Sequence, residues 1–250
     1  MDVKLVARTL DLFERFAAEQ RPLPLTELAR LLNVPASSCL ALVRTLVSRG
    51  YLYEVRKRGG YYPTRRLQLI ANAIDAVDPV VEMLHPHLVE LRDATGETAV
   101  LAKLHDTAVV YLDVVESERA VRYAPPPGAL RPLHANSIGK AIFGELDAGT
   151  QQALGAKLVF ERLTEATTGD LATLVDQAAE AHARGWCANI GESAPELSAV
   201  AVALDFGSDL YGISVGGPTE RIRQHVEAHA GALMEAKQRI LATWRENEAS

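Results

Sequence analysis

The chain has 250 residues, of which 48% are hydrophobic and 23% charged, and its net charge at pH 7 is −6. This composition is that of an ordinary soluble protein, and no window offers the roughly 18 uninterrupted apolar residues of a membrane span. The first residues lack the apolar core of a signal peptide. The two cysteines, Cys39 and Cys187, cannot form a disulfide framework or a four-ligand zinc site. We therefore expect a cytoplasmic protein with no membrane partner.

The charge is unevenly distributed along the chain. Residues 1–67 contain 12 Lys and Arg against 6 Asp and Glu, whereas residues 68–250 contain 14 against 26. A basic segment is often only a solvated face. A positively charged end on an acidic chain is also typical of a module that binds a polyanion.

The first 50 residues predict three helices. Residues 3–18 carry apolar side chains at helical spacing, and the prolines that follow end this helix. Thr26 is expected to cap a helix of barely two turns at residues 27–32. A tight turn at 33–35 leads into a third helix at 36–49. Two short helices joined by a three-residue turn predict a helix-turn-helix unit.

A β-hairpin is expected directly after the third helix. Residues 51–55 and 61–62 are rich in aromatic and β-branched side chains. The tip between them holds three consecutive cations, Arg56, Lys57 and Arg58. Such a hairpin is typical of a basic wing that contacts the DNA backbone beside a recognition helix. The alternative is a winged helix that is used only for protein contacts.

The third helix divides into two faces. Its apolar face should pack on the preceding helices. On the other face, Ser37 and Ser38 can donate hydrogen bonds to phosphates or base edges, and Arg44 can reach a guanine or a phosphate. Leu40 and Ala41 either touch thymine methyl groups or widen the core. The residues predicted to contact double-stranded DNA are Thr26, Ser37, Ser38, Leu40, Arg44, Arg56, Lys57 and Arg58.

Residues 66–92 predict connector helices between two domains, 1–65 and 93–250. An apolar stripe with steps of three and four residues runs along them, interrupted by Pro79 and kinked near Pro86. The stripe either joins two copies of the chain or packs on its own domains. Because two linked half-sites give DNA binding more specificity than one, we expect a homodimer or tetramer. The stripe consists of Leu67, Ile70, Ile74, Val77, Val81, Leu84, Leu88 and Leu91.

Residues 93–250 predict an α+β domain with a mostly antiparallel sheet flanked by helices. Strands are expected at 98–104, 108–115, 121–123, 197–204 and 210–216, and helices at 138–146, 171–184 and 222–244. A mixed domain of this kind, linked to a DNA-binding module, is typical of a sensor of small molecules.

Catalytic and metal-binding patterns are sparse. The chain contains no G-x-S-x-G elbow, no G-x-G-x-x-G and no P-loop. His225 and His229 have a spacing that suits a metal ion, but no third ligand lies nearby in the sequence. We therefore expect no enzyme activity, no metal and no cofactor. Two alternatives remain: an enzyme for a small acid with an appended DNA module, and a winged-helix adaptor without a ligand.

Several motifs, in order, resemble those of the IclR family of transcription regulators. PLPLTELA and VPASS, at 22–29 and 34–38, resemble its helix-turn-helix. GETAVL at 96–101, VYLDVVES at 110–117 and RPLHANSIGKA at 131–141 resemble its effector-domain signatures. The resemblance implies a GAF-like effector domain, an oligomer, and ligand-controlled binding to the operator of a catabolic or metabolic operon.

The resemblance also implies where a small organic acid or aromatic metabolite binds. The site would comprise Asn136, Ser137, Ile138, Asn189, Leu197, Ala199, Ser214 and Gly216. Ala199 stands where members often have cysteine, Gly216 where serine is frequent, and Asn189 in place of an acid. Because a lost polar partner is costly unless the ligand lacks the matching group, these departures fit an effector larger or more apolar than a two-carbon acid.

Overall fold

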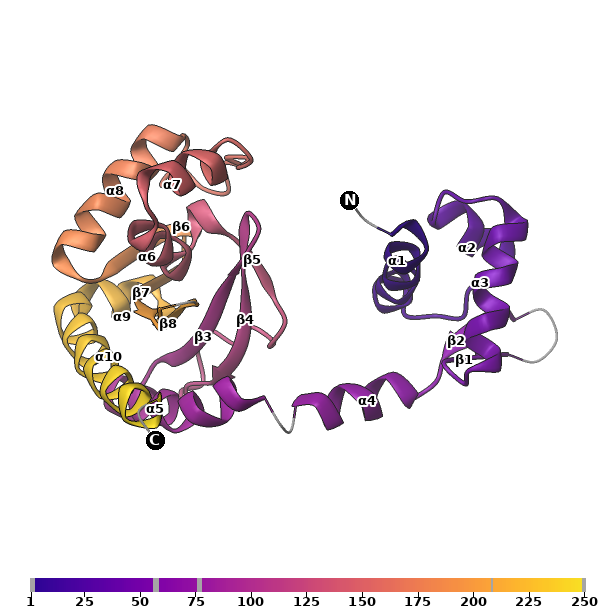
Figure 1. Cartoon of the computed structure of the whole chain (residues 1–250), viewed down its shortest axis with the longest axis horizontal. Coiled ribbons are helices and arrows are strands. Elements are labelled where there is room, and N and C mark those ends of the chain that lie inside the picture. Colours follow the sequence, from indigo (N-terminus) through magenta and orange to yellow (C-terminus); the bar gives the residue numbers. More distant parts are fainter. Residues whose placement is uncertain (1–2, 56–58, 76–77, 208, 249–250) are drawn as a thin grey trace. The chain divides into compact units, whose positions relative to one another are not determined.

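The computed structural model describes residues 3–55, 59–75, 78–207 and 209–248. It divides into two compact units, Met1–Asp78 and Pro79–Ser250 (Figure 1). The division falls inside the predicted connector. Helix α4 (Arg66–Asp75) belongs to the first unit and α5 (Pro79–Thr95) to the second.

The first unit is a winged helix-turn-helix, as predicted. Three helices precede a two-stranded antiparallel hairpin, and their apolar faces, including those of Leu12, Leu28 and Leu46, form one buried cluster. The elements are α1 (Lys4–Glu19), α2 (Leu25–Leu31), α3 (Ala36–Ser48), β1 (Leu52–Glu54) and β2 (Tyr61–Pro63).

The start of α2 differs from the prediction. Thr26 is not the N-cap but the second residue of the helix, because Pro24 occupies the N-cap position with extended backbone angles. The carbonyl of Pro24 accepts the amides of Glu27 and Leu28. A pair of backbone hydrogen bonds between Leu23 and Tyr61 holds the chain extended up to this point. The fixed φ of proline then suits the turn into the helix.

Helix α3 shows the two faces that the sequence predicts. Cys39 and Val43 are buried together with the other apolar residues of the inner face. Ala41 is exposed and Leu40 half-buried, and neither belongs to the core cluster. The possibility that these two residues widen the core is therefore wrong.

The second unit is built on a six-stranded sheet in which every neighbouring pair of strands is antiparallel, so the predicted α+β class is confirmed. The order across the sheet is β5-β4-β3-β8-β7-β6. The strands are β3 (Thr98–His105), β4 (Ala108–Val115), β5 (Leu130–Pro132), β6 (Cys187–Ala194), β7 (Leu197–Asp205) and β8 (Leu210–Pro218).

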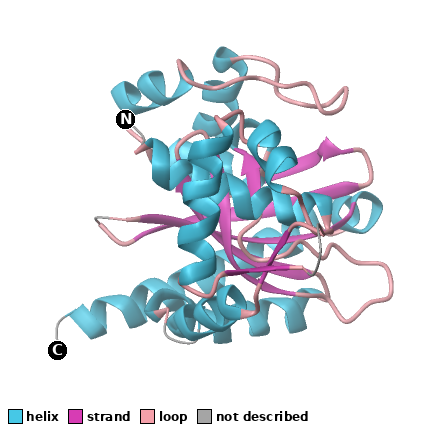
Figure 2. Ribbon diagram, turned by 90° about the vertical axis from the view of Figure 1, so that its right-hand side faces the viewer, coloured by secondary structure: helices cyan, strands magenta, loops and turns pink. Residues whose placement is uncertain are grey.

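Helices cover both faces of this sheet (Figure 2). Helices α5 and α10 pack on one face and α6 on the other, with α8 packed against α6 and β6. Burial on both faces explains the continuous apolar run of β7, whose residues 200–204 are all buried. The remaining elements are α6 (Ser137–Glu145), α7 (Ala148–Gly155), α8 (Leu171–Arg184), α9 (Thr219–Gln224), α10 (Val226–Glu248) and a 3-10 turn, Leu133–Ala135.

Several elements of the second unit differ from the prediction. Strand β6 and helix α7 were not predicted. Residues 121–123 are not a strand: the third strand is β5, which pairs with β4 after a turn at Gly128, where φ is +82°. The prolines at 125–127 donate no backbone hydrogen bonds, so they cannot extend a strand into the sheet. The closing helix is divided at His225, whose φ of −130° lies outside the helical region.

The apolar stripe of the connector is divided between the two units. Leu84, Leu88 and Leu91 are fully or almost fully buried against the sheet of their own unit. Ile70 and Ile74, on α4, are exposed. Among the described residues no single helix has the length and apolarity to cross a membrane, although the bent pair of α2 and α3 meets that criterion when counted together.

Candidate functional site

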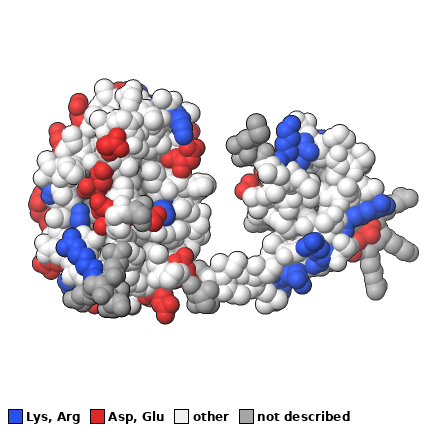
Figure 3. Space-filling view, in the orientation of Figure 1, with Lys and Arg blue, Asp and Glu red and all other residues white. Residues whose placement is uncertain are grey.

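The residues predicted to contact DNA lie on the exposed surface of the first unit, as far as the structure describes them. Thr26, Ser37, Ser38 and Arg44 are exposed. No side chain caps α3, so its first amides stay available to an anion next to the two serines. The wing cations Arg56–Arg58 lie outside the described residues. Figure 3 shows Lys and Arg over the first unit, and more Asp and Glu over the second.

The base of the wing is joined to the helix-turn-helix by its backbone. Tyr61 of β2 exchanges backbone hydrogen bonds of 2.9 and 3.0 Å with Leu23, just before α2. Gly60 adopts a φ of +89°, and a Cβ there would lie 2.4 Å from the backbone of Leu23. Only glycine fits this approach, so the strand that leaves the wing is held in a fixed position beside α2.

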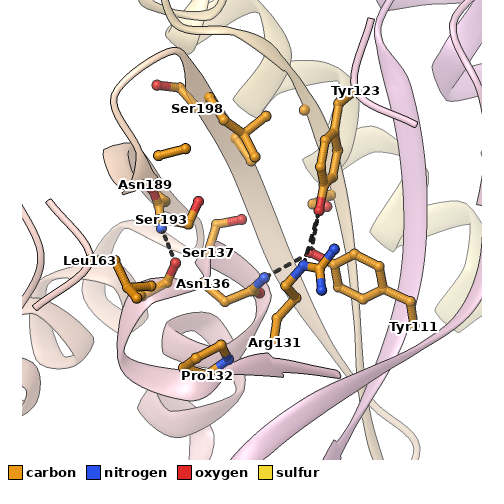
Figure 4. A pocket seen from close by; sticks show the side chains of 16 residues that line it. Tyr111, Tyr123, Arg131, Pro132, Asn136, Ser137, Leu163, Asn189, Ser193 and Ser198 are labelled. Carbon is orange, nitrogen blue, oxygen red and sulfur yellow. Dashed lines mark hydrogen bonds between the residues drawn. The ribbon is translucent and has the colours of Figure 1, made fainter. Parts of the chain in front are cut away.

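The second unit contains a cavity of about 200 Å³ between the start of α6 and strands β6, β7 and β8 (Figure 4). Its wall is mostly apolar, with several hydroxyl and amide groups and one guanidinium. The lining residues are Tyr111, Tyr123, Arg131, Pro132, Ala135, Asn136, Ser137, Leu163, Asn189, Ser193, Ala194, Leu197, Ser198, Ala199, Ser214 and Gly216.

The structure brings seven of the eight predicted effector residues to this one cavity. Ile138 is the exception. Its side chain is fully buried and packs against β8 at Gly212, where an added Cβ would lie 2.4 Å from Ile138 Cγ2. Ile138 therefore anchors α6 on the sheet and is not part of the cavity wall.

Asn136 uses both ends of its amide within the protein. Its Oδ1 accepts hydrogen bonds from the amides of Ile138 and Gly139 and so caps α6. Its Nδ2 donates to the hydroxyl of Tyr111 over 2.9 Å. Burial raises the pKa of Tyr111, which keeps the phenol neutral. Asn136 therefore joins the first turn of α6 to the wall of the cavity formed by β4.

Asn189 is similarly occupied. Its Nδ2 donates to the carbonyl of Ala135 over 2.6 Å, and its Oδ1 accepts the amide of Glu192 over 3.1 Å. These bonds tie the bulge of β6 to the segment that precedes α6. The two asparagines thus shape the cavity, and its unused polar groups belong to other residues.

Nine of the sixteen lining residues were not predicted from the sequence, and Tyr111, Tyr123 and Arg131 are the largest polar side chains among them. Tyr111, Tyr123 and Arg131 lie on one side of the cavity, with Ser193 and Ser198 on the other (Figure 4). The Nε of Arg131 donates to the Tyr123 hydroxyl over 3.4 Å, and the guanidinium lies 5.7 Å from the centre of the Tyr111 ring. Arg131 begins the RPLHANSIGKA motif, which was the one available signal for it.

No group of three or more His, Cys, Asp or Glu in the described part of the chain is arranged to hold a metal ion. His225 and His229 lie near Glu97, whose carboxylate forms ion pairs with Arg119 and Arg221. Burial lowers the pKa of His229.

A winged helix-turn-helix followed by an α+β domain with a ligand-sized cavity defines a class of protein, the two-domain DNA-binding transcription regulator. Two family models agree with this assignment. The IclR helix-turn-helix domain matches residues 5–56, and the bacterial transcriptional regulator IclR C-terminal model matches residues 72–242. The chain belongs to the IclR family, which confirms the resemblance found in its motifs.

Similar proteins of known name are regulators rather than enzymes. The chain is 30% identical over 241 residues to the HTH-type transcriptional regulator BhcR of Paracoccus denitrificans, covering 95% of this chain and 86% of that protein. It is 26% identical over 236 residues to the transcriptional repressor IclR of Escherichia coli, covering 93% and 86%.

Solved structures of similar fold extend over the whole chain. An IclR homolog from Microbacterium hydrocarbonoxydans, complexed with 4-hydroxybenzoate, has a TM-score of 0.79 at 21% identity and covers 97% of this chain and 99% of that one. A transcriptional regulator from Alicyclobacillus acidocaldarius has a TM-score of 0.79 at 25% identity, with 98% and 99% covered.

Proposed function

We propose that the chain is a ligand-responsive regulator of a catabolic or metabolic operon. In this proposal the first unit binds double-stranded operator DNA through α3 and the wing, and the second binds a small organic acid or aromatic metabolite. The observation that carries the proposal is the convergence of residues from four elements, α6, β6, β7 and β8, on one cavity.

The size of the cavity indicates the size of the effector. An engineered cavity of about 150 Å³ holds benzene, and the cavity here measures about 200 Å³. An apolar wall with a few directed polar groups is typical of a small-molecule site. A two-carbon acid would leave much of this volume empty. A monocyclic ligand of the kind named for the Microbacterium structure fits it better.

The connection between the sheet and α5 supports a coupling mechanism. Leu84, Leu88 and Leu91 of α5 pack in the same buried cluster as Leu101 of β3 and Val215 of β8. A ligand that changes the position of β8 would act on α5, and through it on the segment that leads to the DNA-binding unit. In a dimer or tetramer this changes the fit of two winged helices to their half-sites.

The test uses the full chain and duplexes from beside its own reading frame. Fluorescence anisotropy at low salt measures the affinity for the duplex, and each member of a carboxylate panel is then added. We expect binding, and at least one acid that changes the affinity. Failure to bind any flanking duplex would contradict the DNA-binding function. If none of the acids that bind the cavity changes the affinity for the duplex, the coupling is contradicted.

A further inference from the structure

Arg131 is the one charged residue among those that line the cavity, all of which lie in the described part of the chain. No Asp or Glu is present in the wall. The nearby carboxylate of Glu192 forms an ion pair with Lys140, beneath the wall, and is not available to the guanidinium. The cavity therefore carries an uncompensated positive charge.

The guanidinium is held in position by neutral partners. Its Nη1 donates to the carbonyl of Leu130 over 3.0 Å and its Nε to the hydroxyl of Tyr123 over 3.4 Å. The ring of Tyr111 lies beside its cationic plane. Within the described residues Nη2 has no hydrogen-bond partner and Arg131 has no ion pair. A fixed, half-buried cation with a spare donor favours an anionic ligand.

The two asparagines in the cavity wall already use their amide groups within the protein, and the donors that remain beside Arg131 include the neutral hydroxyls of Ser137, Ser193 and Ser214. The Oδ1 atom of Asn136 caps the start of α6 by accepting hydrogen bonds from the amides of Ile138 and Gly139. The Nδ2 atoms of Asn136 and Asn189 donate to Tyr111 and to Ala135. This leaves Arg131 as the strongest donor that faces the cavity.

The floor of the cavity suits a flat apolar body. Leu197 and Ala199 of β7 and Gly216 of β8 lie side by side there. A Cβ at Gly216 would lie 3.4 Å from Ala199 Cβ and 3.6 Å from the Tyr123 ring. The absence of a side chain at Gly216 therefore opens a slot between Tyr123 and the sheet, and a planar ring fits a slot of this form.

We propose that Arg131 binds the carboxylate of a monocyclic aromatic acid whose ring occupies the slot beside Tyr123, Ala199 and Gly216. This assignment rests on the proposed function and names the chemistry of its effector. It places the acid group on the β5 side of the cavity, beside Arg131, a residue outside the effector site that the family resemblance implied.

The test compares acids with their neutral amides on the full chain. Calorimetry with benzoate, 4-hydroxybenzoate and the corresponding benzamides measures each affinity for the wild type, Arg131→Gln, Arg131→Lys and Arg239→Gln. Arg239 is an exposed arginine of α10, remote from the cavity, and provides the matched control. We expect the wild type and the control to prefer an acid over its amide by at least about tenfold.

Arg131→Gln should lose that preference, and Arg131→Lys should keep part of it, because the charge remains while the planar fork is lost. A thermal melt checks that each variant folds. Equal binding of acid and amide by the wild type, an unchanged preference in Arg131→Gln, or no binding of either acid would overturn the assignment. Duplex binding and its response to non-aromatic acids, measured on the same samples, test the proposed function separately.

Discussion

The ammonium of Lys140 lies 2.5 Å from Oε2 of Glu192, and both side chains are buried. The same ammonium donates to Thr168 Oγ1 and to Gln177 Oε1, so its three protons all have acceptors. The pair joins α6, β6, α8 and the loop between α7 and α8. Because α6 and β6 both contribute to the cavity wall, it fixes the frame of the candidate effector site.

Lys140→Met should destabilise the second unit by about 3–5 kcal/mol, because it leaves the carboxylate of Glu192 buried without a counterion. Urea unfolding followed by circular dichroism measures the change. Lys157→Met is the matched control: its pair with Asp106 is exposed on both sides and should contribute less than about 1 kcal/mol. Adding Glu192→Gln to Lys140→Met should recover part of the loss. Equal effects of the two single substitutions would contradict a structural role for the buried pair.

Asn136→Ala should lower the free energy of unfolding by about 0.5–2 kcal/mol, because α6 loses its cap. It also removes the shorter of the two hydrogen bonds donated to the Tyr111 hydroxyl. Asn136→Asp keeps the cap but places a negative charge in the cavity. We expect it to unfold at higher urea than Asn136→Ala while binding acids more weakly than the wild type. Asp147→Ala removes the exposed cap of α7 and is the reference for a cap outside the cavity. A stability of Asn136→Ala equal to the wild type would show that the cap is dispensable.

Replacing Arg56, Lys57 and Arg58 together by Gln should weaken DNA binding and reduce the slope of log affinity against log salt by up to about three units. The reason is that each phosphate contact releases condensed counterions. Anisotropy titrations between low and moderate salt measure the slope. Arg239→Gln is the control, because it removes a positive charge from the second unit and leaves the wing unchanged. A triple variant with the slope of the wild type would remove the wing from the interface.

Local sequence signals predicted α8, whose two ends carry their own capping residues, but not α7, although Asp147 caps its start. Helix α8 matches the predicted span 171–184 residue for residue, because Asp170 caps its start through the amide of Thr173 and Gly185 ends it with a φ of 84°. The hairpin of β7 and β8 is similarly clear from its apolar runs. The start of α2 was misplaced because a distant strand, through Tyr61, holds the residues before it.

The candidate site shows the same limit of local signals. Family motifs located seven of its residues, yet Tyr123 was assigned to a strand. Its position depends on distant contacts: Thr98 Oγ1 donates to the carbonyl of Tyr123, and Arg122 pairs with Glu116. The path of this loop brings Tyr123 into contact with Arg131, and no short-range pattern in the sequence predicts this contact.

His229→Gln should make the stability of the second unit less sensitive to acid. Burial lowers the pKa of His229 below its ordinary value of 6.5; the nearby charges of Arg119 and His225 act in the same direction, and that of Glu97 opposes them. As the pH falls, the unfolded chain therefore binds this proton at a higher pH than the folded chain does. The stabilisation is complete above pH 6.5 and is lost as the pH falls from 6.5 towards the folded pKa, by up to about 1.4 kcal/mol per pH unit. Urea midpoints at pH 7.5 and 5.5 measure the loss, and an equal fall in both proteins would contradict the assignment.

Neither thiol of the native protein should react quickly with a disulfide reagent. Burial raises the pKa of Cys187 to about 11, although the charges of Lys140 and Arg184 oppose the change, and it also raises the pKa of Cys39. Because the thiolate is the reactive form, labelling at pH 8 should follow the rate of unfolding and reach two thiols per chain only in urea. Ala172→Cys, on the exposed face of α8, should add one thiol that reacts at once. A fast native reaction in the wild type would mean that Cys39 or Cys187 is reached without unfolding, and mass mapping of the label would identify which core is open.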